Sequence, residues 1–209
     1  IKGGNTEVFL QQALDAAGTK GADTELISLA KMEIKDCIHC NWCVRKQEEG
    51  KFCNQHDDME LIFPKVIEAD AILLASPVYF TRLSGYMANM LDRLRCLGHG
   101  NHYHRALKGK VGGGLVVSWF RNTGTETALL SLLGAFMASG MTVVSPGLGL
   151  GSPLGAIGLS SEGGEGKFDP KERLGVLKDE YGLASAQQIA REAVDMARVV
   201  KAGQRALKG

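Results

Sequence analysis

The sequence predicts a doubly wound α/β domain, in which a parallel sheet has helices on both faces. Apolar runs of strand length alternate with amphipathic helical stretches along the chain. The runs Ala69–Ala75 and Lys110–Ser118 are apolar almost throughout, which is typical of strands that are covered on both faces. The 209 residues are enough for one domain with a full core, so we expect a single domain over 1–209 with strand order 2-1-3-4-5.

The N-terminal third predicts a helix, a strand and a second helix. After Gly3–Thr6, apolar residues recur at helical spacing, and Thr24–Leu29 is predicted to be a short strand. Asp57 and Asp58 are expected to cap a helix that Pro64 bends or restarts.

The remaining two thirds continue the alternation. The strand Ala69–Ala75 ends at Ser76–Phe80, and Ser84 opens a helix. The strand Lys110–Ser118 leads through a loop to a very apolar helix over Gly124–Ser139. A strand over Met141–Ser145 and closing helices over Lys171–Ala202 are expected after it. The Gly-rich extension 146–170 is too long for an ordinary connection, which indicates a functional or mobile segment.

The charge balance argues against a nucleic-acid-binding protein. Twenty-four basic and twenty-three acidic residues leave a formal net charge of +1. Apolar stretches are too short or too interrupted to span a membrane. We therefore expect small-molecule or protein partners. The cluster of four cysteines with a single fifth cysteine elsewhere favours a reducing compartment, with the cytoplasm as the default.

Four of the five cysteines lie in one predicted loop, 36–56, which indicates a metal site. Cys37, Cys40 and Cys43 are three residues apart, and Cys53 follows after nine intervening residues. This spacing favours a [4Fe-4S] cluster, because consecutive thiolates can reach different corner irons while a more distant Cys supplies the fourth ligand. Structural zinc and plain reduced or paired thiols remain alternatives. We interpret Cys96 as a buried structural thiol.

Three loops that follow strand ends predict a ligand pocket, because ligands of open parallel sheets bind beyond the carboxyl ends of the strands. Lys2–Thr6 offers glycines, a helix N-terminus and one lysine for a phosphate, although an ordinary helix start would look the same. Ser76–Phe80 offers two aromatic rings, and Trp119–Thr127 offers polar atoms for the edge of a planar heterocycle. No arrangement of side chains for nucleophilic or acid–base catalysis stands out, so we predict no catalytic side chain.

Taken together, these motifs resemble those of a known family. Gly-Gly-Asn-Thr, a Cys loop running into Asp57-Asp58-Met59, the stretch from Ala69 to Phe80 and Leu91-Asp92-Arg93 resemble the NADPH-dependent FMN reductase superfamily of flavodoxin-like folds. Within it, the compact Cys motif is similar to that of the iron-sulfur flavoproteins. The segment from Gly151 to Ala156 is similar to one in NAD(P)H:quinone oxidoreductases of the tryptophan-repressor-binding-protein type.

The resemblance implies FMN and a [4Fe-4S] cluster as cofactors. It implies that the cluster is held by Cys37, Cys40, Cys43 and Cys53, although the interval before Cys53 is longer than in the family's motif. The residues expected at FMN are Lys2, Gly3, Gly4, Asn5, Thr6, Ser76, Pro77, Val78, Tyr79, Phe80, Asn122, Thr123 and Gly124.

With these cofactors the chain would be an oxidoreductase that connects two-electron and one-electron chemistry. The implied partners are NAD(P)H, a quinone or a ferredoxin-like protein. The alternatives are a carrier or redox sensor without turnover of its own, and a quinone reductase whose Cys loop holds structural zinc.

Two further expectations concern assembly and the N-terminus. The apolar helix around Ala128–Met137 and the segment 146–170 suggest a homodimer or homotetramer, with the segment covering a neighbouring subunit. Because the first expected element follows a missing central strand, we expect about ten further residues before Ile1, or another segment in that position. Without such a strand, the runs 24–29 and 71–75 would each expose an unpaired edge.

Overall fold

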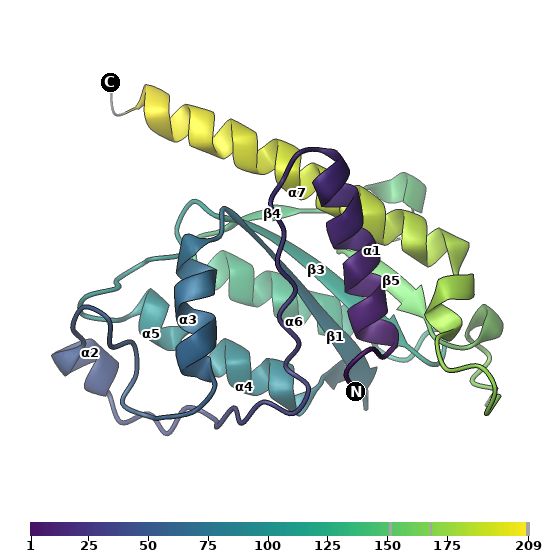
Figure 1. The fold of residues 1–209 in the computed structure, drawn as a ribbon, viewed down its shortest axis with the longest axis horizontal. Coiled ribbons are helices and arrows are strands. Elements are labelled where there is room, and N and C mark those ends of the chain that lie inside the picture. Colours follow the sequence, from purple (N-terminus) through teal and green to yellow (C-terminus); the bar gives the residue numbers. More distant parts are fainter. Residues whose placement is uncertain (151, 168, 208–209) are drawn as a thin grey trace.

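A computed structural model describes residues 1–150, 152–167 and 169–207. Its sheet is built around β3 (Val111–Ser118), which pairs in parallel with β1 (Ala71–Tyr79) along one edge. Along the other edge β3 pairs in parallel with β4 (Thr142–Val144) and then with β5 (Ala156–Leu159). The two-residue strand β2 (Arg82–Leu83) folds back antiparallel on the end of β1. The sheet is seen obliquely in Figure 1.

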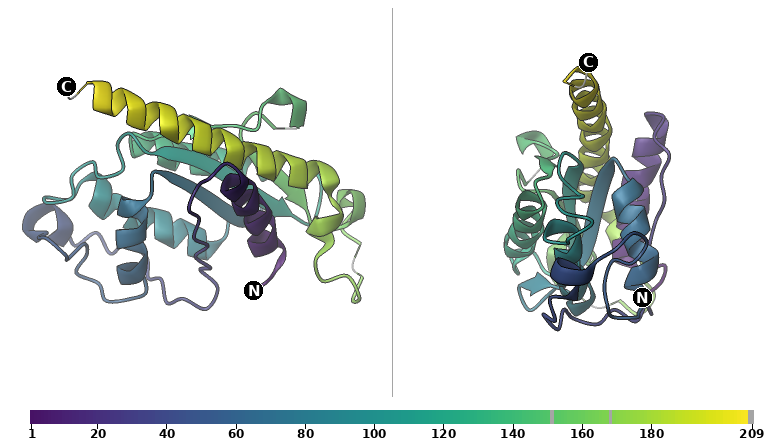
Figure 2. Two further views of the ribbon diagram at one scale, coloured as in Figure 1. Left: turned by 45° about the horizontal axis from the view of Figure 1, so that its top comes forward. Right: turned by 90° about the vertical axis from the view of Figure 1, so that its left-hand side faces the viewer.

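Helices pack on both faces of this sheet, which confirms the predicted doubly wound α/β class. One core cluster joins the sheet to α1 (Asn5–Thr19) and α7 (Glu180–Ala206). A second cluster joins it to α3 (Met59–Glu68), α4 (Gly85–Arg93) and α6 (Thr125–Ala138). Figure 2 shows α1 and α6 on opposite sides of the sheet.

Three consecutive glycines in β3 let these helices approach the sheet closely. A Cβ on Gly112 would lie 2.6 Å from the Phe136 ring of α6, and one on Gly113 would lie 3.3 Å from the Ile189 side chain of α7. Because these β3 residues have no side chains, the helices on both faces of the sheet can pack directly against the strand.

Shorter elements connect this framework. They are α2 (Trp42–Lys46), α5 (Arg95–Gly98) and three 3₁₀ turns at Leu148–Leu150, Glu162–Gly164 and Gly175–Lys178. Pro64 lies inside α3, which continues through it. Within the described ranges, no helix is both long and apolar enough to cross a membrane.

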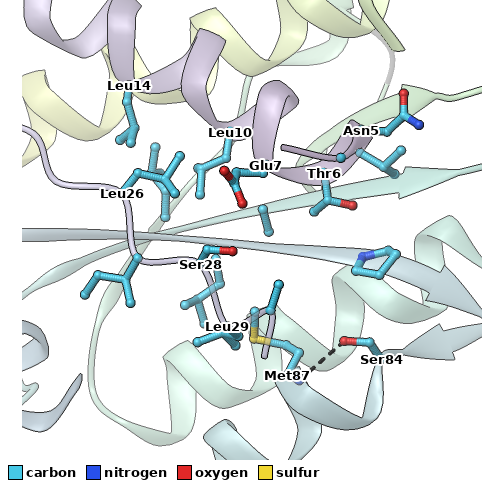
Figure 3. A pocket seen from close by; sticks show the side chains of 18 of the residues that line it. Asn5, Thr6, Glu7, Leu10, Leu14, Leu26, Ser28, Leu29, Ser84 and Met87 are labelled. Carbon is cyan, nitrogen blue, oxygen red and sulfur yellow. Dashed lines mark hydrogen bonds between the residues drawn. The ribbon is translucent and has the colours of Figure 1, made fainter. Parts of the chain in front are cut away.

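The edge of β1 that faces away from β3 borders a cavity. Among the described residues, β2 is the sole strand partner on this edge, and it pairs only with Val78 and Tyr79. The cavity has a volume of about 2660 Å³ and lies between β1, α1 and the segment 21–30. Leu10 and Leu14 of α1 point into it from one side, and Leu26 and Leu29 from the other (Figure 3).

The prediction of a strand over Thr24–Leu29 is wrong for this structure, in which residues 22–29 have no regular secondary structure. The physical reason is that a strand needs a hydrogen-bonding neighbour, and the cavity separates this segment from β1. In the predicted order 2-1-3-4-5, the first strand lies before Ile1 and the second is 24–29. The sheet contains the remaining three in the predicted order, as β1, β3 and β4. The expected strand ahead of Ile1 stays a prediction.

The Gly-rich extension differs from its expectation as well. Its residues Ala156–Leu159 form β5, which continues the edge that β4 begins on β3. This part of 146–170 therefore completes the sheet of its own chain rather than covering a neighbour. The motif residue Gly151 lies outside the described residues.

Candidate cofactor sites

The three predicted loops meet where the cavity opens at the carboxyl ends of β1 and β3. Of the thirteen residues expected at FMN, ten line this cavity: Lys2, Gly3, Gly4, Asn5, Thr6, Pro77, Val78, Tyr79, Phe80 and Thr123. The structure thus brings a helix N-terminus and a strand end together at one opening.

The N-terminus of α1 offers the cavity an anion-binding end. Gly3 has a φ of 69°, and Gly4 caps the helix with no side chain to occupy its first N–H groups. Thr6 adds a hydroxyl near this end of the cavity (Figure 3). A phosphate would fit here through backbone N–H groups and Thr6.

The Asn5 side chain forms hydrogen bonds within the protein. Its amide donates to the Arg173 carbonyl (3.2 Å) and accepts from the Val176 backbone N–H (3.0 Å). Asn5 therefore ties α1 to the segment before α7, and its contribution at the cavity is through the backbone.

Exposed aromatic side chains gather at the same opening. Tyr79 and Phe80 are 60% and 97% exposed at the end of β1, and Trp119 and Phe120 follow β3 with ring centroids 5.5 Å apart. Rings exposed in this way offer an apolar surface against which a planar heterocycle can pack.

The turn that presents Phe80 is held by an unusual backbone. Phe80 and Thr81 both have positive φ (47° and 63°), as a two-residue hairpin turn requires. Gly124, with φ of 90°, packs against it, because a Cβ at this position would lie 2.4 Å from the Thr81 Cα. Gly124 thus supports the turn without lining the cavity.

Two other predicted residues also lie outside the lining. Ser76 is fully buried, and its hydroxyl donates to the Pro77 carbonyl (2.9 Å) and accepts from the Ser84 N–H (3.1 Å). It joins the end of β1 to the start of α4. Asn122 has a left-handed backbone (φ 53°) in the loop after β3.

Sequence reasoning missed the contribution of the segment before α7. Its residues Ser160, Lys167, Arg173 and Lys178 also line the cavity. Lys167 pairs with Glu165, and Lys178 pairs with Glu172. The signal was present as basic residues after the Gly-rich stretch, but β5 could not be recognised there, so nothing in the sequence brought them to the strand ends.

The cysteine loop lies beside α4 and α5, away from α1. Its two ends are joined by a hydrogen bond from the Gln55 amide to the Asp36 carbonyl (2.8 Å). His39 and Asn41 have left-handed backbones (φ 52° and 58°), which turn the chain sharply between the first three cysteines.

The four predicted ligands are free thiols close enough to influence one another. Burial raises the pKa of the Cys43 thiol, Arg95 opposes this rise, and the neighbouring Cys53, Cys37 and Cys40 add to it. In the part of the chain that the structure describes, no three His, Cys, Asp or Glu side chains are already arranged to hold a metal ion. The thiols are thus gathered in one loop but do not converge on one point.

A buried glutamine anchors this loop to the rest of the protein. The Gln47 amide donates to the carbonyls of Phe52 (2.8 Å) and Cys96 (3.0 Å) and accepts from the N–H groups of His102 and Tyr103. Burial strongly raises the pKa of Cys96, which is 2% exposed, in agreement with a structural thiol.

A buried ion pair lies next to the loop. Arg93 forms a two-point contact with the carboxylate of Asp57 (2.5 and 3.1 Å), and both side chains are almost completely buried. Arg93 also donates to the Lys35 carbonyl (3.0 Å). Asp57 therefore does more than cap α3, because its buried carboxylate has the geometry for a fork-shaped contact with Arg93.

The fold and the cavity together define an α/β protein of the flavodoxin type with a large cavity that opens at its strand ends. Residues 1–152 match the model of the family described as NADPH-dependent FMN reductase, and the chain belongs to this family of FMN-dependent oxidoreductases.

Curated relatives point the same way. The chain is 35% identical over 201 residues to an iron-sulfur flavoprotein of Methanocaldococcus jannaschii, with 95% of this chain and 93% of the relative covered. It is 30% identical over 200 residues to an iron-sulfur flavoprotein of Methanosarcina thermophila, covering 96% and 92%.

Solved structures support the fold. The structure of RosB with the bound intermediate 8-demethyl-8-formylriboflavin-5'-phosphate superposes with a TM-score of 0.71 at 17% identity, covering 94% of this chain and 73% of RosB. The Trp repressor binding protein of Bacillus subtilis gives a TM-score of 0.55 at 17% identity, with 90% of each chain covered.

Proposed function

We propose that this chain is an oxidoreductase that binds FMN at the cavity opening and a [4Fe-4S] cluster in the cysteine loop. It would pass electrons between a two-electron partner, such as NAD(P)H or a quinone, and a one-electron carrier of the ferredoxin kind. FMN supplies two-electron exchange with release of single electrons, and the cluster supplies one-electron transfer.

The FMN part of the proposal draws on the chemistry of the cavity opening. The phosphate would bind the first N–H groups of α1 with Gly3, Gly4 and Thr6, and Lys2 would add positive charge. The ring system would pack near Val78, Tyr79 and Phe80. The protein's own part is to bind and orient the ring and to exclude water with its aromatic side chains.

The donor set of the cysteine loop fits a cluster. Cys37, Cys40, Cys43 and Cys53 are free thiols held in one loop whose ends are joined. The buried donor atom Arg93 Nε, which lies beside this loop, has no hydrogen-bond partner among the described atoms. Thiolate and sulfide sulfurs accept hydrogen bonds, so a cluster would give such a donor a partner.

The single observation that carries the proposal is the gathering of these four free thiols in one loop whose ends are joined. The test is to purify the protein anaerobically and measure iron, acid-labile sulfide, zinc and FMN in one sample. We expect iron and sulfide in a 1:1 ratio, near four each per chain, with FMN present. Zinc without sulfide would contradict the cluster and favour the zinc-stabilised quinone reductase.

Substitution of one ligand separates the two cofactor sites. Cys40→Ser should abolish iron and sulfide while FMN stays bound, since Cys40 lies in the loop and not at the cavity. Cys96→Ser is the matched control, and it should leave the cluster in place. Oxidation of NAD(P)H by the wild type would distinguish an enzyme from a carrier or sensor without turnover.

Assembly and location belong to the same proposal. The apolar α6 carries the exposed side chains Leu130 and Met137, which suits contact with a second copy in a homodimer or homotetramer. Exposed thiols such as Cys40 are kept reduced in a cytoplasmic environment.

A further inference from the structure

Two arginines on neighbouring helical turns flank the cysteine loop. Arg93 ends α4 and Arg95 begins α5, so both side chains leave the same short stretch of chain. Neither has a role in the binding of FMN, because neither lines the cavity.

Arg93 has one donor left over after its structural contacts. Its two terminal nitrogens contact Asp57, and one of them also donates to the Lys35 carbonyl. Its Nε atom is buried and has no partner in the described structure. Burial lowers the pKa of Arg93, but the hydrogen bond to Asp57, the charges of Cys53 and Asp57 and an interaction with the Cys53 side chain raise it overall. The Cys53 side chain thus lies close enough to the Arg93 guanidinium to influence its charge.

Arg95 makes the corresponding contact with another predicted ligand. Its guanidinium lies 3.7 Å from the Cys43 sulfur and donates to the Asn41 side chain at 2.7 Å. Asn41 occupies the left-handed position between Cys40 and Cys43. Arg95 therefore contacts both the Cys43 sulfur and the side chain of Asn41, the residue at the turn between Cys40 and Cys43.

From these contacts we infer that Arg93 and Arg95 are positioning residues for the cluster. Arg93 Nε donates to the sulfur of Cys53 and Arg95 to the sulfur of Cys43, and together they raise the cluster's reduction potential. This inference rests on the proposed function. Hydrogen bonds to cluster sulfurs and nearby positive charge both favour the reduced, more negative form.

The same contacts account for the long interval before Cys53. Nine residues separate it from Cys43, so sequence spacing alone does not hold it near the others. The pair of Arg93 with Asp57 is buried and joined by two contacts, and the Arg93 Nε donor has no other partner in the described structure. A cysteine at this distance along the chain can therefore be held as a fourth ligand by tertiary contacts.

The test is a redox titration of the anaerobically purified holoprotein, with the cluster followed by electron paramagnetic resonance. We expect Arg95→Gln to lower the ratio of reduced to oxidised cluster at a fixed potential by about threefold, or about 28 mV at 59 mV per tenfold change. Arg93→Lys should shift the potential in the same direction, because an ammonium can stay near Asp57 but has no Nε donor for Cys53.

The control is Arg205→Gln, which removes the same charge from the exposed end of α7 and should titrate like the wild type. Iron and sulfide are measured in every variant. If Arg95→Gln holds a full cluster and titrates at the wild-type potential, the inference is overturned and the proposed function stands. If the wild type holds no iron and sulfide, the proposed function itself fails. Arg93→Lys is not needed for this decision, so its failure to fold would not affect it.

Discussion

The buried contact between Asp57 and Arg93 shows how one pair can decide stability. Burial alone would raise the pKa of Asp57, but hydrogen bonds from Arg93, Lys35 and Met59 and the positive charge of Arg93 hold it below its usual value. A carboxylate with a lowered pKa in the folded state stabilises the protein above the ordinary carboxylate range. That contribution is lost as the pH falls through the folded pKa.

We therefore expect Asp57→Asn to lower the free energy of unfolding at pH 7 by about 3–5 kcal/mol, because it leaves the Arg93 charge buried without its partner. The difference from the wild type should begin to shrink below about pH 4, where Asp57 of the unfolded chain takes up its proton, and should shrink further as the pH falls through the lowered pKa of folded Asp57. Urea unfolding at both pH values measures it. Asp92→Asn, at an exposed neighbouring position, should be nearly neutral, and an equal loss in both variants would contradict the prediction.

Gly124 gives a second prediction at this scale. Gly124→Ala places a Cβ 2.4 Å from the Thr81 Cα and requires a positive φ of an alanine, so the turn that presents Phe80 must move. We expect weaker FMN binding, measured by flavin fluorescence, together with a modest loss of stability. Gly149→Ala, where a Cβ meets nothing within 4 Å, is the control and should bind FMN normally.

The sequence predicted the residue types of the site better than their contacts. The spacing of Cys37, Cys40 and Cys43 and the glycines of the first loop are local patterns, so they could be recognised directly. The partners of Arg93 and Asn5 could not, because Asp57 and Val176 are brought to them by tertiary folding.

Among the elements, β3 needs glycine at positions where the neighbouring helices leave no space for a side chain. Gly112 faces α6 with no space for a side chain, since a Cβ would lie 2.6 Å from Phe136. We expect Gly112→Ala to destabilise the protein by about 1–3 kcal/mol through overpacking. Gly18→Ala in α1, where a Cβ meets nothing within 4 Å, should instead be neutral or stabilising. Thermal unfolding of the two variants makes the comparison, and equal effects would contradict it.

Helices and strands could be predicted from the sequence where the local pattern of apolar residues is enough to specify them. The run Val111–Ser118, which is buried throughout, and the amphipathic helices were recognised because burial sets their apolar patterns. Residues Thr24–Leu29 have the composition of a strand, but strand formation depends on a neighbour that the segment does not specify. Similarly, β5 was hidden in a Gly-rich stretch because its partner β3 supplies the pairing.

At the scale of the whole molecule, the exposed apolar face of α6 leads to a prediction about assembly. Leu130 and Met137 are 55% and 63% exposed and lie seven residues apart, so they share one face of the helix. If this face joins two subunits, the double change Leu130→Glu and Met137→Glu should give a monomer in light scattering. Val199→Glu, at a 64% exposed site on α7, is the control and should leave the assembly unchanged. A wild type that is monomeric at all concentrations would contradict the proposal.

The cavity beside β1 also has a consequence for the exchange of amide hydrogens with solvent. The Val111 N–H donates to the Asp70 carbonyl, and in a parallel ladder this fixes which residues of β1 face β3. We expect the amides of Ile72 and Leu74 to be protected and those of Ala71, Leu73 and Ala75, which face the cavity, to exchange far faster in the chain of residues 1–209. An apolar peptide that binds as a parallel strand should slow the second group only. Amide exchange followed by nuclear magnetic resonance would thus report, residue by residue, whether this edge of the sheet is open or paired.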